Sequence, residues 1–261
     1  MPKAIAIFDI DGVVRDVGGS YRRALADTVE QFTGQLSAVA YRPAPADIDR
    51  LKSEGCWNND WEASQELIYR HLESQGQPRE QVTLDYDRLV DFFQQRYRGQ
   101  GDDPTQWDGY ITQEPLLMTA AYLERLTHAG ILWAFFSGAT RGSAHYILQQ
   151  RMGLSQPPLV AMEDAPGKPD PTGLLQAVQM VSSALLPVIY AGDTVADMET
   201  VVRARTQFPE RQWLAVGVLP PHAQLDPTYR NTYTQMLMQT GADTVLATVE
   251  ELDAARVRAL L

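Results

Sequence analysis

The chain has 261 residues, of which 44% are hydrophobic and 21% charged, which allows one large domain or two modest ones with an apolar core. Its net charge of −11 excludes extended contact with nucleic acid or an acidic membrane over most of its surface, although a small anion can bind where basic residues gather. The single cysteine, Cys56, excludes an intramolecular disulfide, and the absence of an apolar run of roughly 18 residues excludes a membrane span.

The first predicted element is a short apolar strand, Ala4–Phe8, which leads directly into the stretch FDIDGV. This stretch places Asp9 and Asp11 at the end of the strand and closes with Gly12. Two carboxylates about 4 Å apart repel by about 4 kcal/mol at an effective dielectric constant of about 20. The pair therefore needs a cation between its members or a chemical task that requires both.

More than a hundred residues separate this strand from the next one, and most of them have helical patterns. A segment of this length is too long for a loop and too helical for a linker. We therefore expect an α-helical domain at residues 16–113, inserted into a core domain made of residues 1–15 and 114–261. The helices predicted in the insertion are Tyr21–Phe32, Pro45–Ser53, Trp61–Ser74 and Tyr86–Tyr97.

The insertion contains the stretch CWNNDWEAS, which combines two indoles with two amides. Asp60 is the expected N-cap of the helix that begins at Trp61. That local role does not explain Asn58 and Asn59, which are candidate substrate-binding residues. Contact with substrate and a purely local role stay equally open for this stretch.

The second half of the chain alternates strands and helices. Near-continuous apolar strands are typical of a sheet covered on both faces, and strand–helix–strand alternation predicts parallel pairing with right-handed crossovers. We expect an α/β fold, a Rossmann-like parallel sheet with helices on both faces. The predicted strands are Ile131–Phe136, Leu159–Met162, Pro187–Ala191, Trp213–Leu219 and an edge strand Thr244–Ala247, and the predicted helices are Gly142–Met152, Thr172–Ala184, Val195–Arg205 and a closing helix over 249–261.

Polar residues follow each of the first four strands, and ligands of open α/β sheets bind at the carboxyl ends of the strands. Together these residues predict a cation site beside an anion site, with Arg15 and Arg141 also placed to meet an anion. The residues at the four strand ends are Asp9 and Asp11, then Ser137 and Gly138, then Gly167, Lys168 and Pro169, and finally Gly192, Asp193 and Asp197.

Four stretches at these strand ends, FDIDGV, FFSGAT, GKPDP and GDTVADM, resemble in their order the four motifs of the haloacid dehalogenase (HAD) superfamily. The helical insertion after the first motif resembles the cap of subfamily IA, to which phosphoglycolate phosphatase-like and β-phosphoglucomutase-like enzymes belong. The resemblance covers nearly the whole chain in architecture and some two dozen residues in motif. One departure is Val13-Val14, where the family often has Thr-Leu or Thr-Val, and it leaves the substrate open.

The resemblance implies a role in phosphoryl transfer for each matching position. Asp9 would attack phosphorus and form an aspartyl-phosphate, and Asp11 would protonate the leaving oxygen and then deprotonate the attacking water. Ser137 and Lys168 would bind the phosphoryl oxygens. Physical chemistry agrees, because a carboxylate is a weak nucleophile that a phosphate dianion repels, and nearby cations offset that repulsion. The backbone N–H of Gly138 is expected at the start of a helix, where anions bind readily.

The resemblance also implies a magnesium site. The side chains of Asp9 and Asp193 and the backbone carbonyl of Asp11 would hold Mg²⁺, and Asp197 would support it, directly or through water. Mg²⁺ prefers oxygen ligands and bridges carboxylate to phosphate. Such a cation would make the clustered carboxylates tolerable.

We therefore expect a Mg²⁺-dependent phosphatase that hydrolyses a small phosphorylated metabolite. Two alternatives stay open, a phosphomutase of the β-phosphoglucomutase type and a non-catalytic binding protein on the same fold. A dehalogenase is disfavoured because Asp11 stands where that branch has a tyrosine. With no signal-peptide pattern before the first strand, a cytoplasmic protein is expected, either a monomer or a homodimer, without nucleic-acid or membrane partners.

Overall fold

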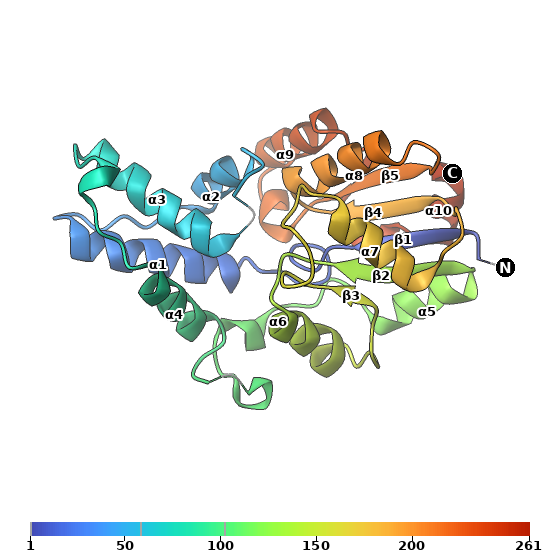
Figure 1. Ribbon diagram of the computed structural model, residues 1–261, viewed down its shortest axis with the longest axis horizontal. Coiled ribbons are helices and arrows are strands. Elements are labelled where there is room, and N and C mark those ends of the chain that lie inside the picture. The colour runs from blue at the N-terminus through green and yellow to red at the C-terminus, as the bar shows by residue number, and fades with distance from the viewer. Residues whose placement is uncertain (1, 58, 102) are drawn as a thin grey trace. The chain divides into compact units, whose positions relative to one another are not determined.

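A computed structural model describes residues 2–57, 59–101 and 103–261. The chain divides into two compact units, each described here by itself. The core unit comprises Met1–Asp16 and Pro115–Leu261, and the helical unit comprises Val17–Glu114. Figure 1 shows the helical unit in blue to green, inserted between the first strand and the rest of the core unit.

The core unit is built on a six-stranded sheet in which all pairs are parallel, with the strand order β3-β2-β1-β4-β5-β6. The predicted α/β fold with a parallel sheet is thereby confirmed. The strands are β1 (Ala4–Phe8), β2 (Ile131–Phe136), β3 (Leu159–Val160), β4 (Val188–Gly192), β5 (Trp213–Val218) and β6 (Thr244–Leu246).

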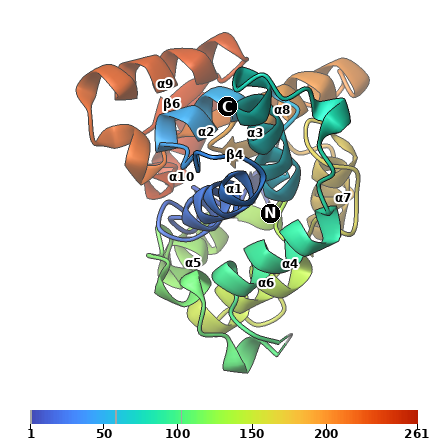
Figure 2. The same ribbon diagram turned by 90° about the vertical axis from the view of Figure 1, so that its left-hand side faces the viewer.

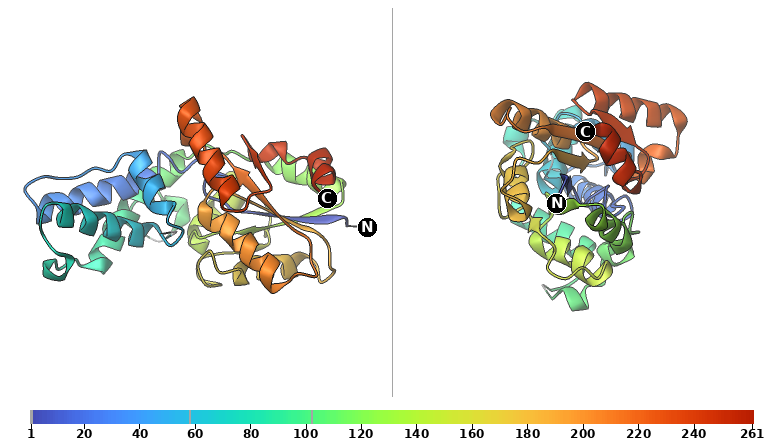
Figure 3. Two further views of the ribbon diagram at one scale, coloured as in Figure 1. Left: turned by 90° about the horizontal axis from the view of Figure 1, so that it is seen from above. Right: turned by 90° about the vertical axis from the view of Figure 1, so that its right-hand side faces the viewer.

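Helices cover both faces of this sheet, as the end-on view in Figure 3 shows. Every residue of β1 is buried, because alternate side chains face opposite layers. Ile5 and Ile7 belong to the apolar cluster formed with α7, α8 and α9, whereas the ring of Phe8 packs edge-on against Tyr122 of α5 at 6.0 Å. The helices of this unit are α5 (Ala120–His128), α6 (Arg141–His145), α7 (Thr172–Val181), α8 (Val195–Gln207), α9 (Pro227–Gln239) and α10 (Ala254–Leu260).

The register of the sheet brings the carboxyl ends of the central strands to one edge. Phe8 of β1 pairs with Phe135 of β2 and with Ala191 of β4. The residues that follow these strands therefore emerge together, which positions the first, second and fourth motifs side by side.

The two chain segments that lead into and out of the helical unit pair with each other within the core unit. The amide of Asp16 donates to the carbonyl of Pro115 at 2.9 Å, and the amide of Leu117 donates to the carbonyl of Val14 at 2.8 Å. An antiparallel bridge joins Arg15 to Leu116 between them. The long insertion thus begins and ends at neighbouring points of the core.

The helical unit packs around α1, which contacts both α3 and α4 (Figure 2). Its interior includes an aromatic group in which the ring of Tyr21 lies 3.9 Å from that of Tyr97 and 5.6 Å from that of Phe93. The helices are α1 (Tyr21–Leu36), α2 (Pro45–Lys52), α3 (Asp60–Ser74) and α4 (Tyr86–Tyr97).

Three local expectations were wrong. Helix α3 begins at Asp60 and its N-cap is Asn59, whose side chain accepts from the amide of Trp61 at 2.9 Å. The segment after β2 forms α6 and then a π-helical stretch, Tyr146–Arg151, instead of one α-helix. The closing helix is interrupted because Asp253 accepts hydrogen bonds from two following amides and starts α10 anew.

None of the described helices combines the length and the apolar character that crossing a membrane requires.

Candidate active site

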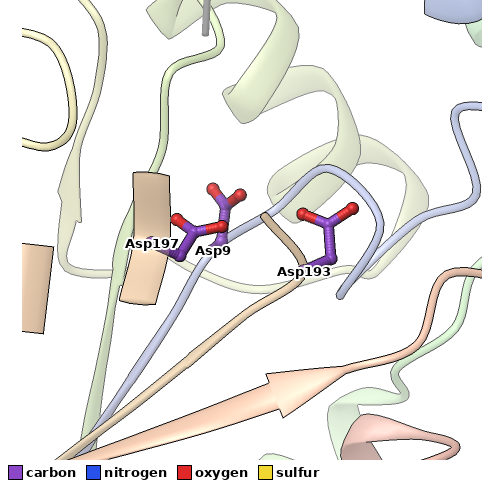
Figure 4. A group of neighbouring side chains, drawn as sticks. All are labelled: Asp9, Asp193 and Asp197. Carbon is purple, nitrogen blue, oxygen red and sulfur yellow. The ribbon is translucent and has the colours of Figure 1, made fainter. Parts of the chain in front are cut away.

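Three buried carboxylates meet at the carboxyl edge of the sheet (Figure 4). Asp9 directly follows β1, Asp193 directly follows β4, and Asp197 lies in the first turn of α8. One oxygen from each lies within 4.8 Å of the others. Like charges at this separation repel strongly in a buried site, so the arrangement requires positive charge.

Lys168 supplies part of that charge. Its ammonium lies 2.9 Å from Oδ1 of Asp9 and 2.7 Å from Oδ1 of Asp197, and its side chain is almost fully buried. Burial alone would lower the pKa of Lys168, but the two carboxylates outweigh this effect and raise it. Its ammonium also lies over the rings of Phe136 and Tyr190, at 5.1 and 5.4 Å from their centroids. Lys168 is therefore held as a cation between the two acids.

Asp197 is bound on both of its carboxylate oxygens. Oδ1 accepts from Lys168 and from the hydroxyl of Tyr190 at 2.8 Å, while Oδ2 accepts from the amide and the hydroxyl of Thr194 at 2.9 and 2.7 Å. Thr194 and Asp197 form the capping box of α8. Burial opposes ionisation of Asp197, but Lys168 and these hydrogen bonds prevail and lower its pKa. Asp197 thus fixes the position of the Lys168 ammonium.

The pKa of Asp9 is shifted in the opposite direction from that of Asp197. Burial raises the pKa of Asp9 to about 7, a shift that Lys168 opposes and that Asp197 and Asp11 reinforce. Lys168 alone thus does not offset the burial of Asp9 together with the negative charge of its neighbours. A further cation at this edge of the sheet would favour the ionised form of Asp9, which is the form that can attack phosphorus.

Glycine allows the loop after β1 to approach Asp193 closely. Gly12 has a φ of +74°, and a Cβ at this position would overlap the carboxylate of Asp193. The backbone carbonyl of Asp193 accepts from the hydroxyl of Tyr233 in α9 at 3.0 Å. The loop after β4 is therefore anchored to α9, and the loop after β1 can lie against Asp193 only because residue 12 has no Cβ.

The second motif places Ser137 and Gly138 directly after β2, as the register requires. Ser137 is buried, and its hydroxyl accepts from the amide of Ala139 at 3.1 Å. Helix α6 begins only at Arg141, with Thr140 as its N-cap. The expectation that the amide of Gly138 opens a helix was therefore wrong, because this amide belongs to the loop before the helix.

Asp11 is held by Arg15. The guanidinium of Arg15 is fully buried, with Nε 2.6 Å and Nη2 2.5 Å from Oδ1 of Asp11, whose side chain is 26% exposed. The Asp11 carboxylate is thus an anionic partner of Arg15. Direct contact of Arg15 with substrate stays a prediction.

The remaining candidates have local partners. The guanidinium of Arg141 pairs with Asp164, so its predicted binding of substrate stays a prediction. Asn59 uses its side-chain oxygen to cap α3. Asn58 lies outside the described residues.

The donor set fits Mg²⁺. Carboxylate oxygens are the ligands that this ion prefers, and three converge here. Because the oxygens of Asp197 are engaged by Lys168, Tyr190 and Thr194, the side chains of Asp9 and Asp193 are the ones that would hold the ion. Burial is the main cause of the raised pKa of Asp9, and a cation bound by Asp9 and Asp193 would lower it.

Sequence reasoning missed three residues that support this site: Tyr190, Thr194 and Tyr233. Thr194 carried a signal, because the spacing T-x-x-D before an apolar run is typical of a capping box. Tyr190 carried no such signal, because its apolar strand is typical of a buried core strand. Tyr233 is distant in sequence from the carbonyl that it binds.

Comparison with known proteins identifies the family. A family model described as haloacid dehalogenase-like hydrolase matches residues 3–205. The imidazoleglycerol-phosphate dehydratase of Phytophthora nicotianae is 28% identical over 254 residues, which are 94% of this chain and 50% of that protein, so the chain spans about half the length of this relative.

Solved structures agree on the fold. A phosphatase from Thermococcus thioreducens has a TM-score of 0.60 at 21% identity, covering 88% of this chain and 98% of that one. A HAD family hydrolase from Deinococcus radiodurans, solved with bound phosphate and sodium, has a TM-score of 0.59 at 19% identity, covering 99% and 96%. The family predicted from the four motifs is confirmed, and the chain belongs to the haloacid dehalogenase-like hydrolases.

Proposed function

We propose that the protein is a Mg²⁺-dependent phosphatase that hydrolyses a small phosphorylated metabolite through an aspartyl-phosphate. The observation that carries this proposal is the buried ammonium of Lys168 between Asp9 and Asp197, next to the carboxylate of Asp193. A phosphoryl group brought to Asp9 would meet a positioned cation at the carboxyl edge of the sheet. Positioning and charge neutralisation supply most of the catalysis in phosphoryl transfer.

In the first step Asp9 attacks phosphorus, and the bond from phosphorus to the leaving oxygen breaks. Asp11 gives a proton to that oxygen. In the second step Asp11, now ionised, takes a proton from a water that attacks the aspartyl-phosphate, which releases phosphate and regenerates Asp9. Lys168 offsets the charge of the phosphoryl oxygens, Ser137 and the amide of Gly138 bind them, and a bound Mg²⁺ supplies further charge neutralisation.

The solved structure of a family member with bound phosphate supports an anion site on this fold. The Phytophthora nicotianae relative extends the choice of test compounds, because its name specifies a phosphate ester of an imidazole-bearing polyol. Its name describes a protein of twice this length, so we carry over only the compound as a candidate to assay.

The test is phosphate release across phosphorylated sugars, phosphoglycolate, nucleotides, amino-alcohol phosphates and imidazoleglycerol phosphate, with Mg²⁺ present. Asp9→Asn is the control, because a neutral amide cannot form the phosphoenzyme. We expect steady release by the wild type and none by the folded variant. Isomerisation of a sugar phosphate that needs a sugar bisphosphate and gives no net release of phosphate would establish a phosphomutase instead, and no turnover of any compound would leave a binding protein.

A further inference from the structure

The ion pair between Arg15 and Asp11 has no part in the mechanism proposed above. Arg15 is among the largest fully buried side chains of the protein. Burying a guanidinium carries a large desolvation cost that only well-placed partners offset. Both of the nitrogens that contact Asp11, Nε at 2.6 Å and Nη2 at 2.5 Å, approach the same oxygen, Oδ1.

The backbone of Arg15 is fixed on two sides. Its carbonyl accepts from the amide of Gly12 at 2.9 Å, and an antiparallel bridge joins it to Leu116. The guanidinium therefore approaches Asp11 from a rigid and fully buried position, while the Asp11 side chain stays 26% exposed. Contact with two nitrogens of a fixed guanidinium restricts rotation of the short Asp11 side chain, and such restriction keeps a proton donor in position.

We propose that Arg15 is a positioning residue for Asp11: by binding Oδ1 it orients the carboxyl group so that Oδ2 carries the proton to the leaving oxygen. This inference rests on the proposed phosphatase function. In the step concerned, an electron pair of Asp9 forms the bond to phosphorus, the bond from phosphorus to the leaving oxygen breaks with its pair on oxygen, and that oxygen takes the proton of Oδ2. Asp11 is left ionised, and its Oδ1 remains on Arg15.

If Arg15 positions the proton donor, the effect of replacing Arg15 must depend on the leaving group. A poor leaving group such as phenolate needs the proton as the bond breaks, whereas the far more acidic p-nitrophenol departs without it. The parameter to compare is kcat/KM, which covers the reaction only up to departure of the leaving group and so excludes hydrolysis of the phosphoenzyme. Phenyl phosphate and p-nitrophenyl phosphate form one matched pair, and the best alkyl phosphate of the panel with acetyl phosphate forms a second.

The variants are Arg15→Met, which removes the fork, and Arg15→Lys, which keeps the charge as a single donor. We expect Arg15→Met to lose roughly 10- to 100-fold more kcat/KM on the poor leaving group than on the good one, as misplacing a general acid requires. Arg15→Lys should show a smaller selective loss. The ratio within one preparation cancels any difference in the folded fraction, and Arg15→Lys carries the test if Arg15→Met does not fold.

Arg205→Met is the matched control in the same unit. Arg205 pairs with Asp243 and donates to the carbonyl of Trp213 at 3.2 Å, so its loss perturbs an ion pair without touching Asp11. Its leaving-group ratio should equal that of the wild type. Equal losses on both members of each pair for the Arg15 variants would overturn the positioning role while the phosphatase function stands. Absence of phosphate release by the wild type itself would instead overturn the proposed function.

Discussion

Replacing Lys168 by methionine should destabilise the metal-free protein strongly, because two buried carboxylates lose the cation they share. The attraction of Lys168 to ionised Asp197 at 2.7 Å is worth about 6 kcal/mol at an effective dielectric constant of about 20, against several kcal/mol for burying the ammonium. The attraction to Asp9 at 2.9 Å is of similar size when Asp9 is ionised, which is the case for only part of the molecules at pH 7. Removing one member of a buried pair typically costs about 3–5 kcal/mol. We expect a loss in this range in the free energy of unfolding at pH 7.

The expected loss has an upper bound that depends on pH. With Lys168 the pKa of Asp197 lies below its ordinary value of 3.8, so its ionisation stabilises the fold above that pH. In the variant that lacks Lys168, burial raises the pKa of Asp197. The folded state must then either contain protonated Asp197 or bury its unpaired charge. Protonation costs about 1.4 kcal/mol per pH unit above 3.8, or about 4 kcal/mol at pH 7. The difference between variant and wild type should therefore shrink as the pH falls toward 4.

Urea unfolding in EDTA at pH 5 and pH 7 measures this difference. Lys52→Met is the control, because its ion pair with Asp60 at 2.8 Å is partly exposed and should be worth only about 0.2–1 kcal/mol. Adding Asp197→Asn to Lys168→Met should restore part of the stability, since it removes one unpaired acid. A loss below about 1 kcal/mol at pH 7, or an equal loss at both pH values, would refute the reasoning.

Phosphate release should require Mg²⁺ and be inhibited by Ca²⁺, because calcium favours longer bonds of about 2.3–2.6 Å that would hold Asp9 in a poor attacking position; full activity in excess EDTA would contradict this. Gly12→Ala should weaken Mg²⁺ binding, measured by calorimetry, because a Cβ would overlap the carboxylate of Asp193 and φ is +74°. Unchanged affinity would show that the loop moves freely. Asn59→Ala should lower the free energy of unfolding by about 1 kcal/mol through loss of the α3 cap, while Asn59→Asp should not. A substrate-selective fall in kcat/KM for Asn59→Ala would reveal a contact with substrate instead.

The sheet and the position of its polar residues were predictable because both depend on short-range pattern. A five-residue apolar run such as AIAIF is compatible with a buried strand and too short for a helix. Parallel pairing then fixes where the next residues emerge, so the sequence alone predicts that Asp9, Ser137 and Asp193 lie at one edge of the sheet.

Side-chain partners were less predictable because they depend on rotamers and on elements distant in sequence. Arg15 was predicted to meet an anion, and its pairing with Asp11 depends on the rotamer of a buried side chain, which the sequence does not specify. Asn59 and Asp60 are both good helix caps, and a shift of one residue in the backbone determines which is used. The hydroxyl of Tyr190 in β4 donates to Asp197 in α8, and sequence spacing does not predict such a contact between a strand and a helix.

The pairing of Val14 with Leu117 and of Asp16 with Pro115 makes the helical unit, in topological terms, one long hairpin loop of the core. Because both ends of the insertion are joined at one ladder, it can be lengthened, shortened or exchanged in evolution without changing the strand order of the sheet. A chimera that joins residue 16 to residue 115 through a short turn, or through the insertion of another family member, should leave the sheet intact. The core unit and the helical unit can then diversify independently within a single gene.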